Sequence, residues 1–446
     1  MKRFLACVSA AIALVGYAEP ELCGDGVQDD TAAIQTRLDS GTNCVYLPPP
    51  LKEYLISRPL RIGSGQELRL DRLTRIRLAP KSNCHMLVNR DREKGNRRVA
   101  VTGGVWDYDN LRQKCNQGLW MISDDPEYNR PKYTDGKYRP DRYLGVAMYF
   151  ENVTDLELSG VTFRNPVTYA AQFCKVSYFT VRDIIFDFTT WNPAKSNMDG
   201  VHFDGCCHHG RITNLRGTCF DDMVALNAND VHCAAQEGPI TDVDIDGVYA
   251  DYSHSAVRLL STNADCPVKR ITIRNVHGNF YRYAVGLTRL LHNRPGRGVM
   301  DDIVIEDCSV GSAPWPDDLP PLLVKYFRYM PIVFCDNRLD IGNLTIRNLH
   351  RSERADPVPT ISLGRETHIA NLTVRDCVQE NHLASPLIFL QNLGRIDSKT
   401  LDNVQLRTAP GAATNILETT DKLWTDRGLI SDGKVDDGGY PEPPKP

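Results

Sequence analysis

The sequence lacks any long apolar run after its first residues. Residues 1–18 combine a positively charged start with an apolar stretch that ends in a small residue, the pattern of an export signal. The stretch is shorter than the roughly 20 residues that a membrane-spanning helix needs, which disfavours a transmembrane anchor. We therefore expect a soluble protein that is secreted or periplasmic and has no integral membrane segment.

The chain also lacks a large excess of charge of either sign. Its net charge is −4 over 446 residues, which argues against a general binder of nucleic acid or anionic membranes. Oligomeric state is left open.

Cysteine is frequent but does not point to a metal or to a complete set of disulfides. Fourteen cysteines less Cys7 of the expected signal leave thirteen, an odd number that excludes complete internal pairing. Residues 206–209 read Cys-Cys-His-His, a spacing that fits no common zinc pattern. Neighbouring residues on a strand also point to opposite faces, so we expect neither a metal nor a cofactor.

A short phrase recurs along the chain at spacings of 23 to 41 residues. An aliphatic residue is followed two positions later by Gly, Asp or Asn in eight of nine copies, and these residues tolerate the left-handed backbone of a tight turn. The next position is mostly small or aliphatic, with Cys308 and Cys377 as small hydrophobes. The nine aliphatic residues are Leu158, Val181, Leu215, Ile245, Ile273, Ile305, Ile346, Val374 and Leu406.

A column of turns beside a column of buried side chains indicates coils that stack, because one such unit cannot bury its own apolar face. We predict an all-β fold, a right-handed parallel β-helix forming a single domain over residues 19–435. A short helix over residues 32–38 is expected to cap its first end, with strands at 45–47 and 54–56. Residues 106–143 and 311–332 are interpreted as insertions, and 436–446 as a disordered tail.

Three acids precede short apolar strand patterns in the middle of the chain. Asp199 comes before one pattern, and Asp221 and Asp222 come before the next. If these strands are neighbours in a parallel stack, they lie about 4.8 Å apart and the acids cluster on one surface. Clustered carboxylates suit cleavage of a glycosidic bond, in which one acid protonates the leaving oxygen and another activates water.

Two stretches carry a resemblance to known families. Residues 24–49, with GDGVQDDTAAIQTRLDS and VYLPP, resemble the entry segment of the pectate-lyase-like β-helix superfamily. The motifs Asn-Met-Asp-Gly at 197–200, Phe-Asp-Asp at 220–222 and Ser-His-Ser at 253–255 resemble the active-site sequence of glycoside hydrolase family 28, the polygalacturonases and their relatives. That family carries Asn-Thr-Asp-Gly, Gly-Asp-Asp, Gly-His-Gly and Arg-x-Lys on successive coils.

The resemblance implies roles for individual residues. Asp221 is expected to protonate the leaving oxygen, and Asp199 and Asp222 to hold and deprotonate the attacking water, so that the anomeric carbon is inverted. His254, one coil beyond, is expected to hydrogen-bond the acid or the substrate. Asn197, His202 and Asn227 are further candidates for substrate binding. His202 should face outward, in contact with substrate or simply exposed, because it alternates with inward-facing residues.

The Arg-x-Lys motif that binds the galacturonate carboxylate in the family is missing from residues 282–289. We expect Arg258, together with Arg282 or Arg289, to supply positive charge instead. An arginine fork matches a carboxylate or sulfate, but it can equally hold the hydroxyls of a neutral sugar or an internal acid. The substrate is therefore predicted as a polysaccharide or oligosaccharide, pectin-like or other, with its sugar undetermined.

Two other functions stay open. A β-helix lyase or uronate epimerase has one foothold, because residues 199–204 loosely echo the Asp-Pro-His-Asp segment of alginate epimerases, although no nearby Lys or Arg is clearly placed as the base. A non-catalytic carbohydrate-binding β-helix is the second, and in that case Asp221 and Asp222 are ordinary turn residues.

Overall fold

The computed structural model describes residues 21–113, 145–192, 195, 197–229, 236–289, 296–317 and 330–420, together with the backbone of 133–134 and 137–138. The expected export signal and tail, and most of the first expected insertion, lie outside these ranges. Among the helices that are described, none has the length and apolar character needed to cross a membrane.

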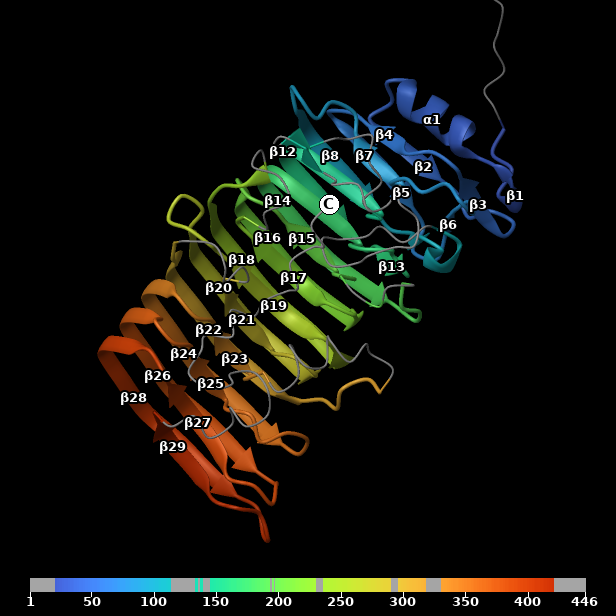
Figure 1. The fold of residues 1–446 in the computed structure, drawn as a ribbon. Helices are drawn as coiled ribbons and strands as arrows, with labels where there is room; N and C mark the ends of the chain where they lie inside the picture. Colours follow the sequence, from blue (N-terminus) through green and yellow to red (C-terminus); the bar gives the residue numbers. More distant parts are fainter. Residues whose placement is uncertain are drawn as a thin grey trace, which may run out of the picture.

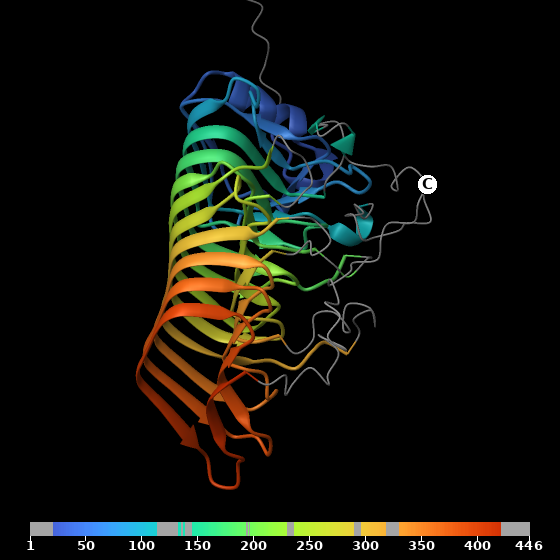
Figure 2. The ribbon, with the colours of Figure 1, turned by 60° about the vertical axis from the view of Figure 1, so that its left-hand side comes forward.

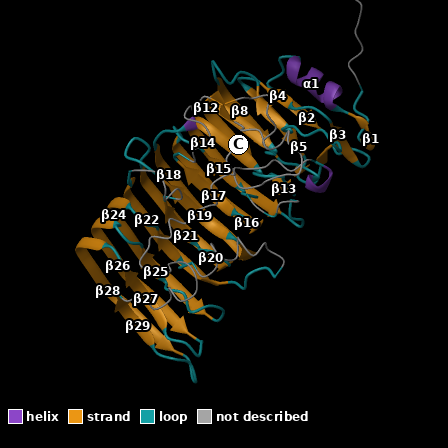
Figure 3. Ribbon diagram, viewed as in Figure 1, coloured by secondary structure: helices purple, strands orange, loops and turns teal. Residues whose placement is uncertain are grey.

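The chain winds into a right-handed parallel β-helix, as the repeats predict. One end is built from α1 and the first short strands, and the coils then stack along a single axis (Figures 1 and 2). Almost all secondary structure is strand (Figure 3). The first coils comprise β1 (Asp25–Asp29), α1 (Thr31–Asp39), β2 (Cys44–Leu47), β3 (Glu53–Ile56), β4 (Leu60–Ile62), β5 (Gln66–Leu70), β6 (Arg75–Leu78), β7 (Leu87–Asn89), β8 (Asn96–Thr102), β9 (Val105–Asp107) and the 3₁₀ helix η1 (Asn110–Arg112).

Each later coil consists mainly of one long strand, which bends between two faces, and one short strand on a third face. The long strands are β12 (Met148–Ser159), β14 (Ala171–Asp187), β16 (His208–Thr218), β18 (Ile240–Ser253), β20 (Val268–Phe280), β22 (Gly298–Ser312), β24 (Leu339–Glu353), β26 (His368–Asn381) and β28 (Arg395–Thr408). The short strands of the third face are β15 (Val201–Phe203), β17 (Asp222–Asn227), β19 (Ser255–Leu260), β21 (Val285–Thr288), β23 (Val333–Cys335), β25 (Ile361–Leu363), β27 (Leu387–Asn392) and β29 (Asn415–Thr419), and they continue the stack begun by the first residues of β12 and β14. The short strand β13 (Thr162–Arg164) instead pairs with β9 and with the end of β14. Apart from these, β10 (Tyr133–Thr134) and β11 (Lys137–Tyr138) form an antiparallel pair.

The aliphatic residues of the repeat form the core. Equivalent positions of consecutive long strands pair directly in register, for example Ile245 with Ile273 and Ile273 with Ile305. All three side chains are completely buried. Cys308 and Cys377 lie in the same core, as expected. Full burial of an aliphatic side chain is worth about 1.5–3 kcal/mol, so each added coil supplies several such contributions.

The expected column of turn residues exists, but two of its nine copies lie in a different register from the predicted one. Leu215 pairs with Ile184, so the turn residue of that coil is Asn214 rather than Gly217. In the last coil the turn residue is Asn403 rather than Thr408. With these corrections every copy has Gly, Asp or Asn at the turn, each with a left-handed backbone; the residues are Gly160, Asp183, Asn214, Gly247, Asn275, Asp307, Asn348, Asp376 and Asn403.

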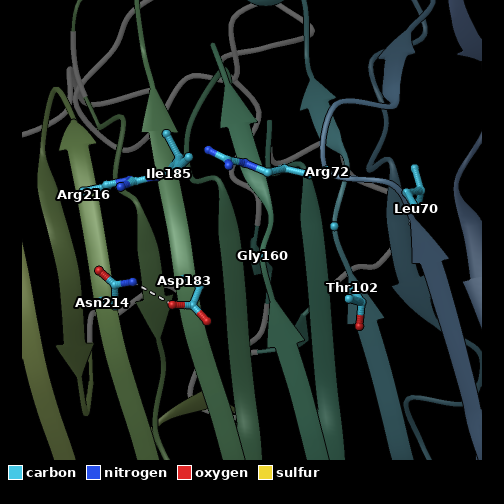
Figure 4. Close-up of a pocket in the computed structure, with 9 residues that line it drawn as sticks. Leu70, Arg72, Thr102, Gly160, Asp183, Ile185, Asn214 and Arg216 are labelled. Carbon is cyan, nitrogen blue, oxygen red and sulfur yellow. Dashed lines mark hydrogen bonds between the residues drawn. The ribbon is translucent and has the colours of Figure 1, made fainter. Parts of the chain in front are cut away.

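Side chains in this column bond to one another along the axis. Asn214 Nδ2 donates to Asp183 Oδ1 over 2.6 Å, which Figure 4 shows beside a shallow pocket at this corner of the coil. Asn348 bonds to Asp307 and Asn403 to Asp376 in the same way. The turn residues therefore set the backbone and also link neighbouring coils.

The first end of the solenoid is capped by the expected helix. α1 buries Ile34 and Leu38 against the first coils. Asp29 satisfies one backbone group at the helix start, because its Oδ1 accepts the N–H of Thr31 over 2.9 Å. Asp30 makes no side-chain cap and instead accepts the backbone N–H of Gly24 and Leu55.

The start of the first expected insertion and the cysteines both belong to the coils in the described part of the chain. Residues 105–107 still form a coil strand, β9, so the coil continues into the start of the first expected insertion. All eleven cysteines in the described part of the chain are free. Cys207 is buried in the core whereas Cys206 is only partly buried, and both lie in the turn before β16, where Cys206 has a left-handed backbone.

Candidate active site

Asp199 and Asp222 stand next to each other because of strand register. Val201 of β15 pairs with Val224 of β17, which places the two acids at equivalent positions of consecutive coils. Gly200 permits this close approach, because a Cβ there would lie 2.5 Å from the Met223 carbonyl oxygen. The glycine of the Asn-Met-Asp-Gly motif is thus required by packing.

Asp221, His254 and Arg282 form a second row, one position earlier on three consecutive coils. The pairing of Asp222 with Ser255 sets His254 beside Asp221. The backbone N–H of Arg282 donates to the His254 carbonyl, which aligns the third coil. His254 Nδ1 lies 3.3 Å from Asp221 Oδ1 and 2.9 Å from the Ser255 hydroxyl, and the Arg282 guanidinium lies 3.6 Å from the same Asp221 oxygen.

Asp222 is completely buried and is held by two groups from later coils. The Arg258 guanidinium lies 3.5 Å from its Oδ2, and the Tyr283 hydroxyl donates to its Oδ1 over 3.1 Å. Arg258 also donates to Thr288 Oγ1 over 3.1 Å. Gly286 makes room for the tyrosine, because a Cβ there would lie 2.7 Å from the Tyr283 ring.

Asp199 is paired with His202, which lies between two carboxylates. His202 Nδ1 is 2.7 Å from Asp199 Oδ2, and its Nε2 is 3.4 Å from Asp204 Oδ1. The Tyr169 ring stacks on the imidazole at 4.1 Å between ring centroids. His202 faces away from the core as predicted, but simple exposure is wrong, because the residue is only 1% exposed.

Burial sets different protonation states for these groups. Desolvation, followed by the charges of Asp199 and Asp222, raises the pKa of Asp221 well above its ordinary range. Desolvation raises the pKa of Asp199 to about 6 even though His202 opposes the rise. Hydrogen bonds and charges from Asp199 and Asp204 outweigh desolvation at His202 and raise its pKa to about 10. At neutral pH His202 is therefore cationic and Asp199 mostly ionised, while the raised pKa of Asp221 favours its protonated form.

The pKa of His254 shifts in the opposite direction to the pKa of His202. Burial, together with the positive charges of Arg282 and Arg258, lowers the pKa of His254 well below its ordinary value. The imidazole beside Asp221 is therefore neutral at physiological pH.

The remaining expected residues, Asn197, Asn227 and Arg289, lie at other positions of the coils. Asn227 ends β17, five residues beyond Asp222, which is about 16 Å along the strand. Arg289 follows β21, and its backbone N–H donates to Asp336 Oδ2 over 3.0 Å with the side chain fully buried. Asn197 has a left-handed backbone, with φ of 54°, at the turn before Asp199.

Sequence reasoning missed three aromatic residues around the site. Tyr283 occupies the same row as Asp222 and Ser255, so aligning the coils would have found it. Tyr169 covers His202, and Tyr281 meets the His254 ring edge-on with centroids 5.1 Å apart. These two belong to other coils, and no local motif marks them.

Asp221, Asp222 and His254 could together hold a cation, because one ligand atom from each lies within 4.8 Å of the others. Two guanidinium groups, however, already face the two carboxylates. This charge arrangement favours an anion or a polar sugar over a metal ion.

No protein-family profile and no curated protein sequence matches the chain. Among solved structures, the chain is similar to a family 28 exopolygalacturonase of Yersinia enterocolitica, with a TM-score of 0.59, 15% identity, and coverage of 89% of this chain and 76% of that one. It is also similar to an endo-xylogalacturonan hydrolase of Aspergillus tubingensis, with a TM-score of 0.52, 14% identity, and coverage of 92% and 97%.

The same architecture serves proteins of other kinds. The surface adhesin PfbA of Streptococcus pneumoniae matches with a TM-score of 0.53 and 14% identity, covering 89% of this chain and 91% of that one. A mannuronan C-5 epimerase A-module of Azotobacter vinelandii also matches at 14% identity. At such identities these likenesses define the fold, a parallel β-helix shared with polygalacturonase-type hydrolases, and the chemistry must be argued from the site.

Proposed function

We propose that the protein is a glycoside hydrolase that cleaves glycosidic bonds of a polysaccharide or oligosaccharide with inversion at the anomeric carbon. One observation carries the proposal: the carboxylates of Asp199, Asp221 and Asp222, from two consecutive coils, meet in one place where desolvation raises the pKa of Asp221 and Asp199. A pair of carboxyl groups that environment forces into opposite protonation states is the requirement for acid/base glycoside cleavage.

Asp221 is the proposed general acid. Desolvation and the two neighbouring acids raise the pKa of its carboxyl group and so favour the protonated form, and Arg282 stabilises the carboxylate that remains once the proton has moved to the leaving oxygen. The neutral His254 ring lies 3.3 Å from the same carboxyl group and restricts its orientation.

Asp199 and Asp222 are the proposed partners of the attacking water. His202 keeps Asp199 ionised, and Arg258 and Tyr283 hold Asp222 in place. The attacking water would lie between them, lose a proton to one carboxylate and add to the sugar from the face opposite the leaving group. The bond to the leaving oxygen breaks as that oxygen takes the Asp221 proton.

The arginines fit one of the alternatives left open for them, the pairing with an internal acid. Arg258 and Arg282 face the catalytic acids themselves, so their first role is to balance internal charge rather than to bind a substrate carboxylate. Action outside the cytoplasm, on secreted or environmental glycans, remains part of the proposal and rests on the expected export signal.

The test is product analysis after incubation with plant, algal and host glycans. Hydrolysis yields new reducing ends without the ultraviolet absorbance of an unsaturated uronate, and Asp221→Asn abolishes it. An absorbing product would instead identify a lyase, and a change of sugar configuration without cleavage would identify an epimerase. If no glycan is changed and Asp221→Asn binds them as the parent does, the protein is a binding module like the adhesin it resembles.

A further inference from the structure

A set of buried polar atoms without partners lies beyond the acids, toward the capped end of the solenoid. Tyr149, Gln172 and His202 pair in register on three consecutive coils and face outward from the same sheet. Three side chains adjoin Tyr149 here: Gln172 beside it, Gln236 bonded to it, and His85 stacked on it. We call Gln172, Gln236 and His85 the acceptor cluster.

The amide of Gln172 has one possible orientation, which leaves its oxygen as the atom that can accept a hydrogen bond. Its Nε2 donates to Asp204 Oδ2 over 2.7 Å, and flipping the amide would set two oxygens against each other. Its Oε1 is buried and has no hydrogen-bond partner. The side chain is 2% exposed.

Gln236 repeats the pattern on Tyr149. Its Nε2 donates to the Tyr149 hydroxyl over 3.0 Å, and that hydroxyl in turn donates to Glu151 Oε2 over 2.9 Å. The tyrosine proton is thus already used, which fixes the amide nitrogen toward it. Gln236 Oε1 is the second buried oxygen with no partner.

His85 supplies the third acceptor. Its ring stacks on Tyr149 with centroids 5.5 Å apart, and its Nδ1 lies 2.9 Å from the Val146 carbonyl oxygen, to which it must donate. Burial lowers the pKa of His85 to about 4, so the ring is neutral and Nε2 carries a lone pair. This Nε2 is buried and unpartnered.

We propose that the acceptor cluster is a substrate subsite that takes a neutral sugar residue through its hydroxyl donors. All three open atoms accept hydrogen bonds, so only a group with O–H or N–H protons can satisfy them. A buried acceptor left unpaired is unfavourable, which gives such a donor a clear advantage over a carboxylate. A uronate carboxylate would also meet Glu151 and Asp204, which are bonded to the same side chains.

Each nearby cation faces an acid or an aromatic ring of this chain. His202 lies between Asp199 and Asp204, and Lys175 lies 3.7 Å from Glu151. Arg92 lies over the Tyr149 ring and has interactions of its own. The inference rests on the proposed hydrolase, since it assigns the sugar bound beside the acids, and it adds that this sugar carries no charge.

The experiment measures calorimetric binding to the full-length Asp221→Asn protein, which removes the proposed acid so that substrate persists. The probes are oligogalacturonate and oligomannuronate, each paired with its carboxyl-reduced counterpart, which differs only in bearing a primary alcohol. We expect at least one reduced oligosaccharide to bind about tenfold more tightly than its acidic partner. Gln172→Met and Gln236→Met, added singly, should each remove most of that advantage, whereas the exposed Gln405→Met should not.

Three results would overturn the subsite: equal affinity within both pairs, binding by the acidic members alone, or no binding by either reduced oligosaccharide. A preference unchanged by Gln172→Met and Gln236→Met, in proteins with the parent's thermal melt, would also reject it. The hydrolase proposal is tested separately, because turnover is measured with Asp221 intact. Neutral binding without turnover therefore leaves the subsite standing and removes the hydrolase, and turnover without the preference does the reverse.

Discussion

Replacing His202 by Gln should displace the pH dependence of catalysis rather than merely weaken it. His202 is a positioning residue, because it contacts Asp199 over 2.7 Å and has no part at the reacting atoms in the proposed mechanism. Gln can still donate a hydrogen bond but carries no charge. Asp199 then loses its adjacent cation while keeping its buried setting, so its pKa must rise.

The size of the effect follows from the ionised fraction of Asp199. With a pKa of about 6, roughly nine tenths of Asp199 is ionised at pH 7. A unit charge about 4 Å away contributes about 4 kcal/mol at an effective dielectric of about 20, an upper bound that solvent relaxation reduces. If the pKa of Asp199 rises by about one unit, roughly half of Asp199 is ionised at pH 7, and if it rises by about two units, about a tenth is ionised. We therefore expect a loss of about twofold to tenfold at neutral pH.

The His202→Gln substitution should also change the stability of the protein in a pH-dependent way. The pKa of His202 is raised from 6.5 to about 10, so its stabilising contribution is complete below pH 6.5 and is lost as pH rises toward 10. Between these two pH limits the contribution of the fully buried His202 to the free energy of unfolding changes by an amount on the order of 5 kcal/mol. The variant should thus be less stable than the parent at pH 6, with the gap closing at alkaline pH.

The assay is the kcat profile across pH for the parent, His202→Gln and the control His277→Gln, whose imidazole lies on β20 and stacks with Tyr249. The acidic limb should move to higher pH in His202→Gln alone, with activity recovering where Asp199 ionises. An unmoved acidic limb in a folded His202→Gln protein would refute the charge argument, whatever the loss of rate.

Three further predictions test other parts of the structure. Asp221→Asn should lower kcat by about 10²–10⁴-fold and raise the melting temperature at neutral pH, since it removes a buried carboxyl group whose ionisation is unfavourable; retained turnover would exclude Asp221 as the acid. Arg282→Ala should move the basic limb of the kcat profile to higher pH, because Arg282 lowers the pKa of Asp221 and the acid must be protonated; a limb that moves down would contradict the assignment. Gly160→Ala should lower the free energy of unfolding by about 1–2 kcal/mol, which is the cost of its left-handed backbone. Gly103→Ala should lower it further in the same denaturant titration, because the new Cβ would also lie 2.1 Å from the Leu70 carbonyl oxygen. Equal losses in the two variants would refute this packing.

The fold could be predicted because each repeat carries the pattern of a coil within a few neighbouring residues. Each coil needs an aliphatic residue and a turn residue two positions later, so Ile273 and Asn275 can be recognised without knowledge of distant contacts. The two register errors, at Leu215 and Leu406, arose because each of these coils has a second aliphatic residue, Ile212 or Leu401, which is the one that precedes the turn residue by two positions. Only the pairing between strands resolves such cases.

The candidate site was partly predictable for the same reason. Asp199, Asp221 and His254 sit at fixed offsets from recognisable strands, so stacking alone brings them together. The burial of His202 depends on Tyr169 of the preceding coil, and the restraint of Asp222 depends on Tyr283 and on the space left by Gly286. These are contacts between side chains of different coils, for which single-coil motifs carry no signal.

The most direct test of acid/base hydrolysis by the three aspartates is the configuration of the first product. Cleavage of a substrate oligosaccharide in deuterated water, followed by NMR from the earliest time points, should show the new reducing end with the opposite anomeric configuration to the bond that was cut. A first product that retains the configuration, or one that carries a carbon–carbon double bond, would contradict the proposed roles of Asp199, Asp221 and Asp222.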